Sequence, residues 1–464
     1  MRVVIVGAGP AGHRVAERLS TRAGPETRVT LLGEEPELPY NRVLLSEVVA
    51  GRLDGARIGL PALPESVRVM RGDPVVSLDR AARTVRTRSG ELVPYDRLVL
   101  ALGARSAMPP VPGLVDEEGA TAKRVVPLRT LADCRRLAEW LPQGGRAVVL
   151  GGGVLGLEAA GALAERGAGV DLVHPGPHPM DRQLGAEPGA ALVSLLADRG
   201  VRCLLGRSAR RWTGDRLVLD DDTHLPADVL VVTAGAVPQT ALAAEAGLPV
   251  ARGVIVDRRQ RTADPNVFAV GDCAEVDGEV SGLLEPAWAQ AETVAAVLAG
   301  VDTEYRAPSV LTRLKLRGVE LAVLGAGDAA TPGTQAVVLS DPARRRFARL
   351  SVRGDLIGGA VLLGFPDAVG PVVRIFDAGG PLPVDRLALL AGRAEAPGAD
   401  IAAAPASEVV CRCHHVTKGA LTEAWRAGAR DRAALGRVTQ AGTGCGGCGP
   451  VLERLGALLA GASE

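Results

Sequence analysis

Four cysteines near the C-terminal end of the chain have a spacing that suits metal binding. They form the pairs Cys411-x-Cys413 and Cys445-x-x-Cys448. Thiolates bind both tetrahedral zinc and iron–sulfur clusters, but structural zinc sites more often use two C-x-x-C pairs. The glycines around the second pair leave backbone N–H groups that can bond to cluster sulfur. The spacing therefore favours an iron–sulfur cluster, with zinc as the alternative.

A glycine-rich turn near the N-terminus has the spacing of a pyrophosphate-binding loop. Gly7, Gly9 and Gly12 lie between an apolar segment at residues 3–6 and a helical pattern. The first glycine permits a tight turn, the second lets the backbone approach the pyrophosphate, and the third lets helix and strand pack closely. The N-terminus of the helix favours phosphate. With a second apolar segment at residues 29–32, the pattern predicts a βαβ unit.

Two adjacent acids follow the second strand of this unit, where a carboxylate is expected to bind the ribose of a dinucleotide. They are Glu34 and Glu35. We predict that Glu34 binds the ribose and keep Glu35 as the alternative.

The same pattern returns in the middle of the chain. Gly151, Gly153 and Gly156 follow a short apolar segment, so we predict a second dinucleotide-binding domain. His174 ends the next strand, at the position where an acid would bind the ribose of NAD and an arginine would favour the 2′-phosphate of NADP. His174 is neither, and residues 175–182 contain only one arginine. The loop therefore favours NADH.

Two further acids lie near these motifs. Glu158 follows the second loop and either stabilises the start of its helix or assists nicotinamide placement. Asp272, in the pair Gly271-Asp272, follows an apolar segment at residues 267–270. An acid at the carboxyl end of a parallel strand faces the ligand crevice. Asp272 is therefore a candidate to accept a hydrogen bond from a ribityl hydroxyl. Alone, the Gly-Asp pair more often marks an ordinary turn, and the two glycine loops at these separations make it specific.

Composition excludes two classes of function. The chain has 464 residues with 53 basic and 53 acidic side chains, whereas nucleic-acid binders usually carry a basic excess. No segment approaches the roughly 20 apolar residues that a membrane span needs. The N-terminal residues lead directly into the first predicted strand, so we expect no signal peptide and a cytoplasmic protein. Structural disulfides are rare in that compartment, which agrees with metal-binding cysteines.

Together these motifs resemble the pyridine nucleotide-disulfide oxidoreductase superfamily, in which FAD binds the first dinucleotide domain and NAD(P)H the second. Residues 95–104 and 110–113 also match its pattern. Many members carry a redox-active cysteine pair beside the flavin. Here the first cysteine is Cys134, so a disulfide-reductase mechanism lacks its nucleophile. Residues 39–47 resemble the flavin-facing helix of ferredoxin-reductase-like members, although Glu47 replaces their usual lysine.

The resemblance implies further cofactor-binding residues besides the glycines, acids and histidine named above. These are Ala11, Arg42, Val75, Ala101, Leu102, Gly103, Gly235 and Trp288. Asp272 matches the position that holds the FAD ribitol, and Leu102 departs from the usual threonine.

The C-terminal cysteines lie in two segments, residues 410–419 and 441–448, that resemble the bacterioferritin-associated-ferredoxin-type [2Fe-2S] domain. The resemblance implies that all four cysteines bind one [2Fe-2S] cluster. The whole chain is similar to the N-terminal half of NAD(P)H-dependent assimilatory nitrite reductase large subunits and to electron-transfer subunits of assimilatory nitrate reductases. No further cysteines remain to ligate a cluster linked to sirohaem, so we expect that this chain does not reduce nitrite itself.

We therefore predict an α/β protein with two Rossmann-like domains of the three-layer β/β/α type, an α+β domain and a small helical [2Fe-2S] module. The predicted boundaries are 1–117 with 248–300 for FAD, 118–247 for NAD(P)H, 301–390 for the α+β domain, 391–407 for a linker and 408–464 for the cluster module.

The predicted function is electron transfer from NAD(P)H, with NADH favoured, through FAD and the cluster to a separate terminal reductase of nitrate or nitrite assimilation. One alternative is a stand-alone NAD(P)H oxidase, diaphorase or ferredoxin-reductase-like enzyme. Another is a non-catalytic iron–sulfur regulatory protein on a flavoprotein scaffold. We expect neither nucleic-acid binding nor membrane association.

Overall fold

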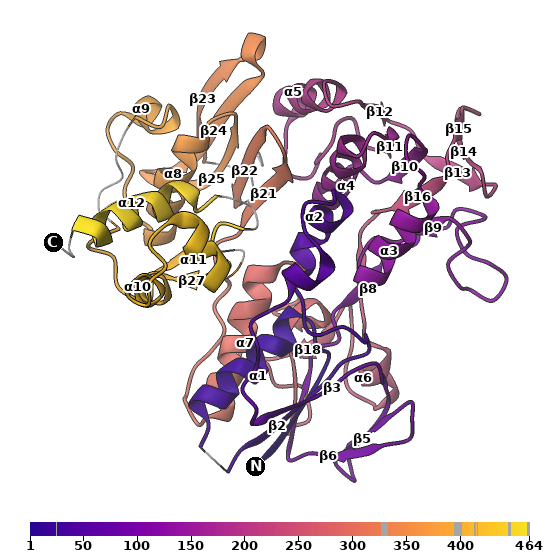
Figure 1. Cartoon of the computed structure of the whole chain (residues 1–464), viewed down its shortest axis with the longest axis vertical. Helices are drawn as coiled ribbons and strands as arrows, with labels where there is room; N and C mark the ends of the chain where they lie inside the picture. The colour runs from indigo at the N-terminus through magenta and orange to yellow at the C-terminus, as the bar shows by residue number, and fades with distance from the viewer. Residues whose placement is uncertain are drawn as a thin grey trace. The chain divides into compact units, whose positions relative to one another are not determined.

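In the computed structural model of the chain, the residues fall into two compact units (Figure 1). The described residues are 1–24, 26–325, 333–393, 401–412, 414, 416–443 and 447–461. The first unit comprises Met1–Pro110, Val126–Glu139 and Ala234–Pro308, and the second comprises Val111–Val125, Trp140–Thr233 and Ser309–Glu464.

A five-stranded parallel sheet forms the centre of the first unit, in the order β19-β7-β1-β2-β3. Its strands are β1 (Arg2–Val6), β2 (Arg28–Leu32), β3 (Val67–Met70), β7 (Arg97–Leu100) and β19 (Val267–Ala269). The remaining elements include α1 (Pro10–Arg22), α2 (Leu45–Val49), β4 (Val75–Asp79), β5 (Thr84–Thr87), β6 (Leu92–Pro94), β8 (Ala104–Ser106), α3 (Leu131–Trp140), β17 (Ala236–Pro238), α6 (Ala241–Glu245), β18 (Val254–Val256), β20 (Ala274–Val276) and α7 (Leu284–Leu298).

The alternation of side chains along β1 explains how this sheet is covered on both faces. Successive side chains of a strand point to opposite faces. Val3 and Ile5 pack into a core with α1 and α7, whereas Val4 and Val6 belong to a second core with β4, β5 and β6. Helices thus cover one face and a small antiparallel sheet covers the other. The predicted three-layer β/β/α arrangement is confirmed for this domain.

A second parallel sheet lies in the second unit, in the order β12-β11-β10-β16-β9. Its strands are β9 (Val125–Val126), β10 (Arg146–Leu150), β11 (Gly169–His174), β12 (Val201–Leu205) and β16 (Val229–Val232). The helices α4 (Val154–Glu165) and α5 (Ala186–Ala197) connect its strands, and β13 (Ala209–Trp212), β14 (Arg216–Leu219) and β15 (His224–Pro226) form a small antiparallel sheet. This sheet contains a βαβ unit like that of the first unit, as the second glycine loop predicts.

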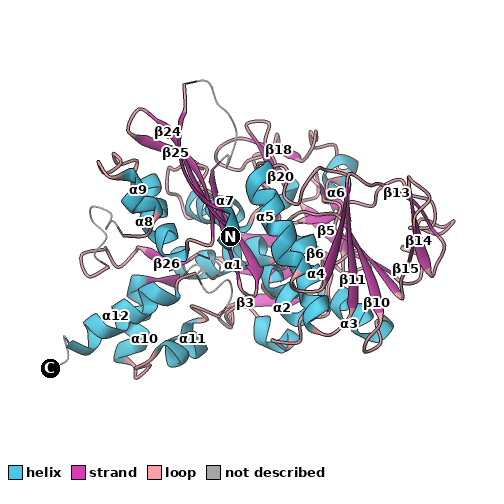
Figure 2. Cartoon of the chain, turned by 90° about the horizontal axis from the view of Figure 1, so that it is seen from above, coloured by secondary structure: helices cyan, strands magenta, loops and turns pink. Residues whose placement is uncertain are grey.

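An antiparallel sheet follows in the same unit, in the order β21-β22-β25-β24-β23. Its strands are β21 (Leu311–Leu316), β22 (Val319–Gly325), β23 (Gln335–Asp341), β24 (Arg346–Arg353) and β25 (Leu356–Leu363). Helices α8 (Pro366–Ala378) and α9 (Arg386–Leu390) lie beside β25 and β24 (Figure 2). Together they enclose a core of their own, which agrees with the predicted α+β domain.

The cluster module consists of two short strands and three helices. They are β26 (Val409–Cys411), β27 (Val416–Thr417), α10 (Lys418–Arg426), α11 (Arg432–Thr439) and α12 (Gly449–Gly461). The side chains of Thr417 and Asp431 cap α10 and α11 by accepting hydrogen bonds from the backbone N–H groups of Ala420 and Ala434. No described helix in the chain is long and apolar enough to span a membrane.

Part of the predicted linker lies against this module. Ile401 packs on the module core. The Lys418 Nζ donates to the backbone oxygens of Ala402, at 2.7 Å, and Ala404, at 2.6 Å. Residues 394–400 of the predicted linker lie outside the described residues.

Candidate cofactor and cluster sites

The first glycine loop has a geometry that only glycine can adopt at two positions. Gly7 has φ +111°, and a Cβ there would lie 2.1 Å from the Ala101 oxygen. A Cβ on Gly12 would lie 1.9 Å from the Gly7 oxygen. Gly9 is the N-cap of α1 and makes no side-chain cap, so the N–H groups of the first helical turn remain available for an anion. The loop therefore fits the pyrophosphate of a dinucleotide.

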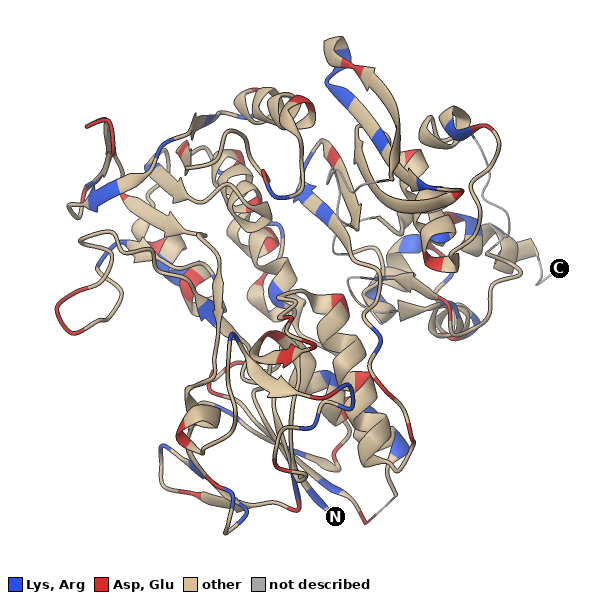
Figure 3. Ribbon diagram, turned by 180° about the vertical axis from the view of Figure 1, so that it is seen from behind, with Lys and Arg blue, Asp and Glu red and all other residues tan. Residues whose placement is uncertain are grey.

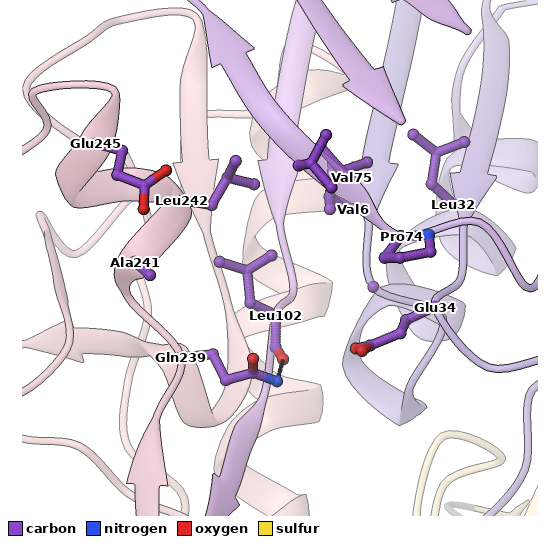
Figure 4. Close-up of a pocket in the computed structure, with 12 residues that line it drawn as sticks. Val6, Leu32, Glu34, Pro74, Val75, Leu102, Gln239, Ala241, Leu242 and Glu245 are labelled. Atoms are coloured by element: carbon purple, nitrogen blue, oxygen red, sulfur yellow. Dashed lines mark hydrogen bonds between the residues drawn. The ribbon is translucent and has the colours of Figure 1, made fainter. Parts of the chain in front are cut away.

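Beside this loop lies a cavity of about 300 Å³ (Figure 4). Four predicted site residues from separate elements line it: Gly7, Glu34, Val75 and Leu102. Gln239, which the sequence did not indicate, also lines the cavity and donates from Nε2 to the Leu102 oxygen at 3.1 Å. Glu34 and Glu245 lie on opposite sides of this cavity, and most of its other lining residues are apolar. A carboxylate beside apolar walls suits the adenosine part of a nucleotide.

The two adjacent acids after β2 have different surroundings. Glu34 lines the cavity. The carboxylate of Glu35 instead accepts a hydrogen bond from the Tyr40 hydroxyl at 2.5 Å and forms an ion pair with Arg42. Burial raises the pKa of Tyr40 above its ordinary value, so its hydroxyl stays protonated and can donate. Glu35 is therefore neutralised locally, whereas Glu34, of the two adjacent acids, remains available to the cavity.

Arg42 lies close to the first loop. A Cβ on Gly9 would be 3.8 Å from the Arg42 Nε, and Arg42 Nη1 donates to the Arg129 backbone oxygen at 3.1 Å. A guanidinium at the N-terminus of α1 suits a phosphate, because cations and helix N-termini both attract anions.

Asp272 lies in a network that fixes the end of β19. The Gly271 N–H donates to Gln290 Oε1 at 2.7 Å. Arg129 Nη2 donates to Asp272 Oδ2 at 2.6 Å, and Arg129 Nε donates to the Ala104 oxygen at 2.7 Å. The sequence did not indicate Arg129, because it is 143 residues from Asp272 and belongs to no motif.

The other predicted residues of the first unit are distributed as follows. A Cβ on Gly271 would be 3.0 Å from the Ala11 Cβ, so these two positions lie in contact. Gly103 and Gly235 have positive φ angles, of +70° and +117°. Trp288 is buried, and its ring centroid lies 5.1 Å from the Arg14 guanidinium. Trp288 does not line the cavity described above.

The second glycine loop repeats the geometry of the first. Gly151 has φ +117°, and its Cβ would lie 2.5 Å from the Thr233 oxygen. A Cβ on Gly156 would lie 1.9 Å from the Gly151 oxygen, whereas a Cβ on Gly153 would have no atom within 4 Å. Thr233 Oγ1 donates to the oxygens of Leu150 and Gly151, both at 3.1 Å, which holds the turn. Gly153 thus leaves space for a pyrophosphate.

His174 lies at the end of β11, beside this loop. Its Nδ1 accepts a hydrogen bond from the Gly152 N–H at 3.2 Å, so the ring proton belongs on Nε2. That Nε2 is buried and 3.3 Å from Asp181 Oδ1, but its geometry does not complete a hydrogen bond. The structure thereby brings Asp181, seven residues later in the chain, to the end of β11.

Glu158 is held by a residue from the antiparallel domain. Lys315 of β21 donates from Nζ to Glu158 Oε2 at 2.5 Å and from its backbone N–H to Oε1 at 2.9 Å. The side chains are 9% and 2% exposed. Both carboxylate oxygens are engaged, so in this structure Glu158 joins α4 to β21.

Three cysteines outside the cluster motif are buried or half-buried thiols. Burial raises the pKa of Cys134 to about 12 and the pKa values of Cys203 and Cys273 to about 11. Thiols with such pKa values are poor nucleophiles at neutral pH. This agrees with the predicted lack of a redox-active cysteine pair.

Two of the four predicted cluster ligands lie in one small core. Cys411, at the end of β26, and Cys448, next to the start of α12, are buried in the same apolar cluster with Trp425 and Leu435. Cys413 and Cys445 lie outside the described residues. Soft thiolates in an apolar shell suit an iron–sulfur cluster.

Comparison with known proteins assigns the class of this flavoprotein. The family model for pyridine nucleotide-disulphide oxidoreductases matches residues 1–295, and the model for the BFD-like [2Fe-2S] binding domain matches residues 409–455. The chain therefore belongs to the pyridine nucleotide-disulphide oxidoreductase family and carries a C-terminal BFD-like [2Fe-2S] domain. It is an NAD(P)H-dependent oxidoreductase with FAD and a [2Fe-2S] cluster as cofactors.

Among curated relatives, two from Bacillus subtilis (strain 168) are similar over 98% of this chain. The nitrite reductase [NAD(P)H] is 34% identical over 467 residues, and the assimilatory nitrate reductase electron transfer subunit is 30% identical over 469 residues. The chain spans 57% and 59% of the lengths of these relatives.

Among solved structures, the fold is similar to that of a ferredoxin reductase from Rhodopseudomonas palustris. That similarity has a TM-score of 0.69 and 31% identity, and it covers 78% of this chain and 91% of the other. The structure of a covalent putidaredoxin reductase–putidaredoxin complex matches with a TM-score of 0.73 and 26% identity, over 82% and 94% of the two chains. The predicted reductase fold is thus confirmed.

Proposed function

We propose that this chain passes electrons from NADH, through FAD and the [2Fe-2S] cluster, to a separate terminal reductase of nitrate or nitrite assimilation. The observation that carries the proposal is the combination, in one chain, of two dinucleotide loops and a cluster module without a redox-active cysteine pair. The similarity to nitrite and nitrate reductase components over 98% of the chain supports the choice of pathway.

In this proposal the first unit binds FAD. The loop at Gly7, Gly9 and Gly12 holds the pyrophosphate together with Arg42, and Glu34 binds the adenosine ribose. Asp272 accepts a hydrogen bond from the ribityl chain, with its carboxylate oriented by Arg129. When bound, FAD supplies the step from two-electron hydride chemistry to one-electron transfer.

The second unit binds the nicotinamide nucleotide, and Asp181 favours NADH. His174 holds the place at which an acid would bind the ribose, and its ring lies against the Asp181 carboxylate. A carboxylate there accepts hydrogen bonds from the ribose hydroxyls and repels a 2′-phosphate. Arg207, whose backbone N–H donates to the His174 oxygen, has its guanidinium in an ion pair with Asp221 at 3.0 Å. The charge of Arg207 is therefore already balanced by an acid.

Rapid mixing of the purified chain with NADH under anaerobic conditions tests the electron path. Flavin absorbance and freeze-quenched EPR spectra follow the two centres separately. We expect flavin reduction first and a reduced-cluster EPR signal afterwards. The matched control is Cys448→Ser, in which the flavin should still be reduced but the cluster signal should be absent. A wild-type cluster that stays oxidised while NADH is consumed would contradict the proposal and favour an oxidase or diaphorase.

Reoxidation of the NADH-reduced chain tests the need for a separate reductase. Nitrate or nitrite alone should leave the flavin and the cluster reduced. Reoxidation by either anion at the rate of NADH turnover would show that the chain itself is the terminal enzyme.

A second candidate function is ferredoxin-reductase-like electron transfer to a small external carrier. It is favoured by the similarity to a ferredoxin reductase that is 31% identical and of which this chain covers 91%. Cys448→Ser distinguishes the two. An external ferredoxin reduced at an unchanged rate by this variant would show that electrons leave from the flavin and not from the cluster.

A further inference from the structure

Strand β21 carries two cations on one face, and each contacts a different functional part of the second unit. Arg313 and Lys315 are two residues apart, so their side chains point to the same side of the strand. Lys315 pairs with Glu158, which follows the second dinucleotide loop by two residues. Arg313 instead contacts Gly447, the residue before Cys448 in the cluster module.

The contact between Arg313 and Gly447 is close. A Cβ on Gly447 would lie 2.4 Å from both Cζ and Nη1 of Arg313. The guanidinium therefore lies directly over the backbone of the residue that precedes Cys448, and any side chain at position 447 would displace it. Because Cys448 is 7% exposed, water screens this charge poorly from the thiolate.

Other cations near the cysteines are balanced by acids. Arg412, between the first two cysteines, forms an ion pair with Asp377 of α8. Arg432, whose guanidinium lies against Gly449, pairs with Glu453 at 2.9 Å. In the part of the chain that the structure describes, no acid forms an ion pair with Arg313.

We propose that Arg313 is a positioning residue that holds the backbone at Gly447, next to Cys448, against β21 and raises the reduction potential of the cluster. Reduction adds one electron and no proton to a cluster that four thiolates already make anionic. A nearby unbalanced cation stabilises this added charge, and the net charge around a cluster is one determinant of its potential. The proposal concerns the cluster that the family assigns, and it does not depend on the identity of the terminal reductase.

An EPR-monitored redox titration with dithionite and mediators tests this proposal without enzymatic turnover. We expect Arg313→Gln to lower the ratio of reduced to oxidised cluster at a fixed potential severalfold and up to tenfold, where tenfold corresponds to about 59 mV for a one-electron couple. Arg313→Lys, which keeps the charge, should retain most of the wild-type ratio. The matched control is Arg317→Gln, an exposed residue just beyond the same strand, which should titrate as wild type.

Iron and labile sulfide content and the EPR line shape show whether each variant has loaded its cluster. If Arg313→Gln does not, Gly447→Ala provides the second test, because its methyl group pushes the guanidinium away and should lower the potential in the same direction. A loaded Arg313→Gln or Gly447→Ala variant that titrates at the wild-type potential would overturn the proposal. An equal shift of the reduction potential in Arg317→Gln would also overturn the proposal, because removing a positive charge that lies away from the cluster would then have the same effect as removing Arg313.

Discussion

Replacing Lys315 by methionine removes the cation that faces Glu158 between α4 and β21. The pair is almost wholly enclosed, with side-chain exposures of 9% for Lys315 and 2% for Glu158. The helix and strand also approach closely, since a Cβ on Gly161 would lie 2.0 Å from Leu316 Cδ1. Water therefore has little room to enter and solvate the carboxylate that Lys315→Met leaves behind.

The expected cost follows from this burial. Breaking a buried ion pair by removing one partner typically costs about 3 to 5 kcal/mol, because an uncompensated charge stays in the interior. With a urea m value of about 3 kcal/mol per molar, the midpoint of unfolding should fall by about 1 M or more. Glu158→Gln combined with Lys315→Met should recover most of this loss, because the amide oxygen can still accept from the residue 315 backbone N–H.

Urea denaturation followed by circular dichroism measures the four members of this double-mutant cycle. A midpoint for Lys315→Met equal to that of the wild type would refute the reasoning. So would a double variant that is no more stable than Lys315→Met. NAD⁺ affinity, measured on the folded variants by calorimetry, separates the two interpretations of Glu158. Unchanged affinity in Glu158→Gln would assign this residue to structure alone, and weakened affinity would assign it to nicotinamide placement as well.

Three further predictions follow from the sites. Asp181→Asn should reduce the preference for NAD⁺ over NADP⁺ by about tenfold, measured as a ratio of dissociation constants, because it removes the equivalent of one hydrogen bond to a charged group. The control variant Asp222→Asn, at an exposed position, should leave this ratio unchanged. An unchanged ratio in Asp181→Asn would refute the assignment. Gly156→Ala should destabilise the second dinucleotide domain, because its Cβ would lie 1.9 Å from the Gly151 oxygen. Gly153→Ala should fold normally and only weaken NAD⁺ binding, because its Cβ would meet no atom within 4 Å. Equal thermal stability of the two variants would contradict this prediction. Cys134 and Cys273 should resist iodoacetamide at pH 8 in the native protein and react after denaturation. Their folded pKa values of about 12 and 11 keep the native thiols protonated at this pH, whereas unfolded thiols, with a pKa of about 8.5, are already partly ionised. Mass spectrometry of the alkylated peptides would reveal any native reaction that contradicts this.

Local patterns predicted the elements of the fold well. The apolar segments expected at residues 3–6 and 29–32 lie in β1 and β2, and the segment at 267–270 contains β19. Glycine spacing predicted both dinucleotide loops, because tight turns and close helix–strand contacts depend on residues within a few positions of one another. These are features that short-range chain geometry decides.

Contacts between distant residues could not be predicted in this way. The sequence favoured Glu34 as the ribose ligand but kept Glu35 as the alternative, and only the positions of Tyr40 and Arg42 show which acid is neutralised. The pairing of Arg129 with Asp272 joins residues 143 positions apart, and no motif marks either partner for the other.

The sequence by itself determined the order of the domains, the glycine loops and the types of cofactor, because each depends on residue types at short and regular spacing. Only the tertiary structure decided which of the charged residues, coloured along the ribbon in Figure 3, meet. It placed Asp181 against His174, Lys315 against Glu158 and Arg313 over Gly447. The physical reason is that ion pairs and close backbone contacts form through space between elements, and many different sequence separations can bring the same two charges together.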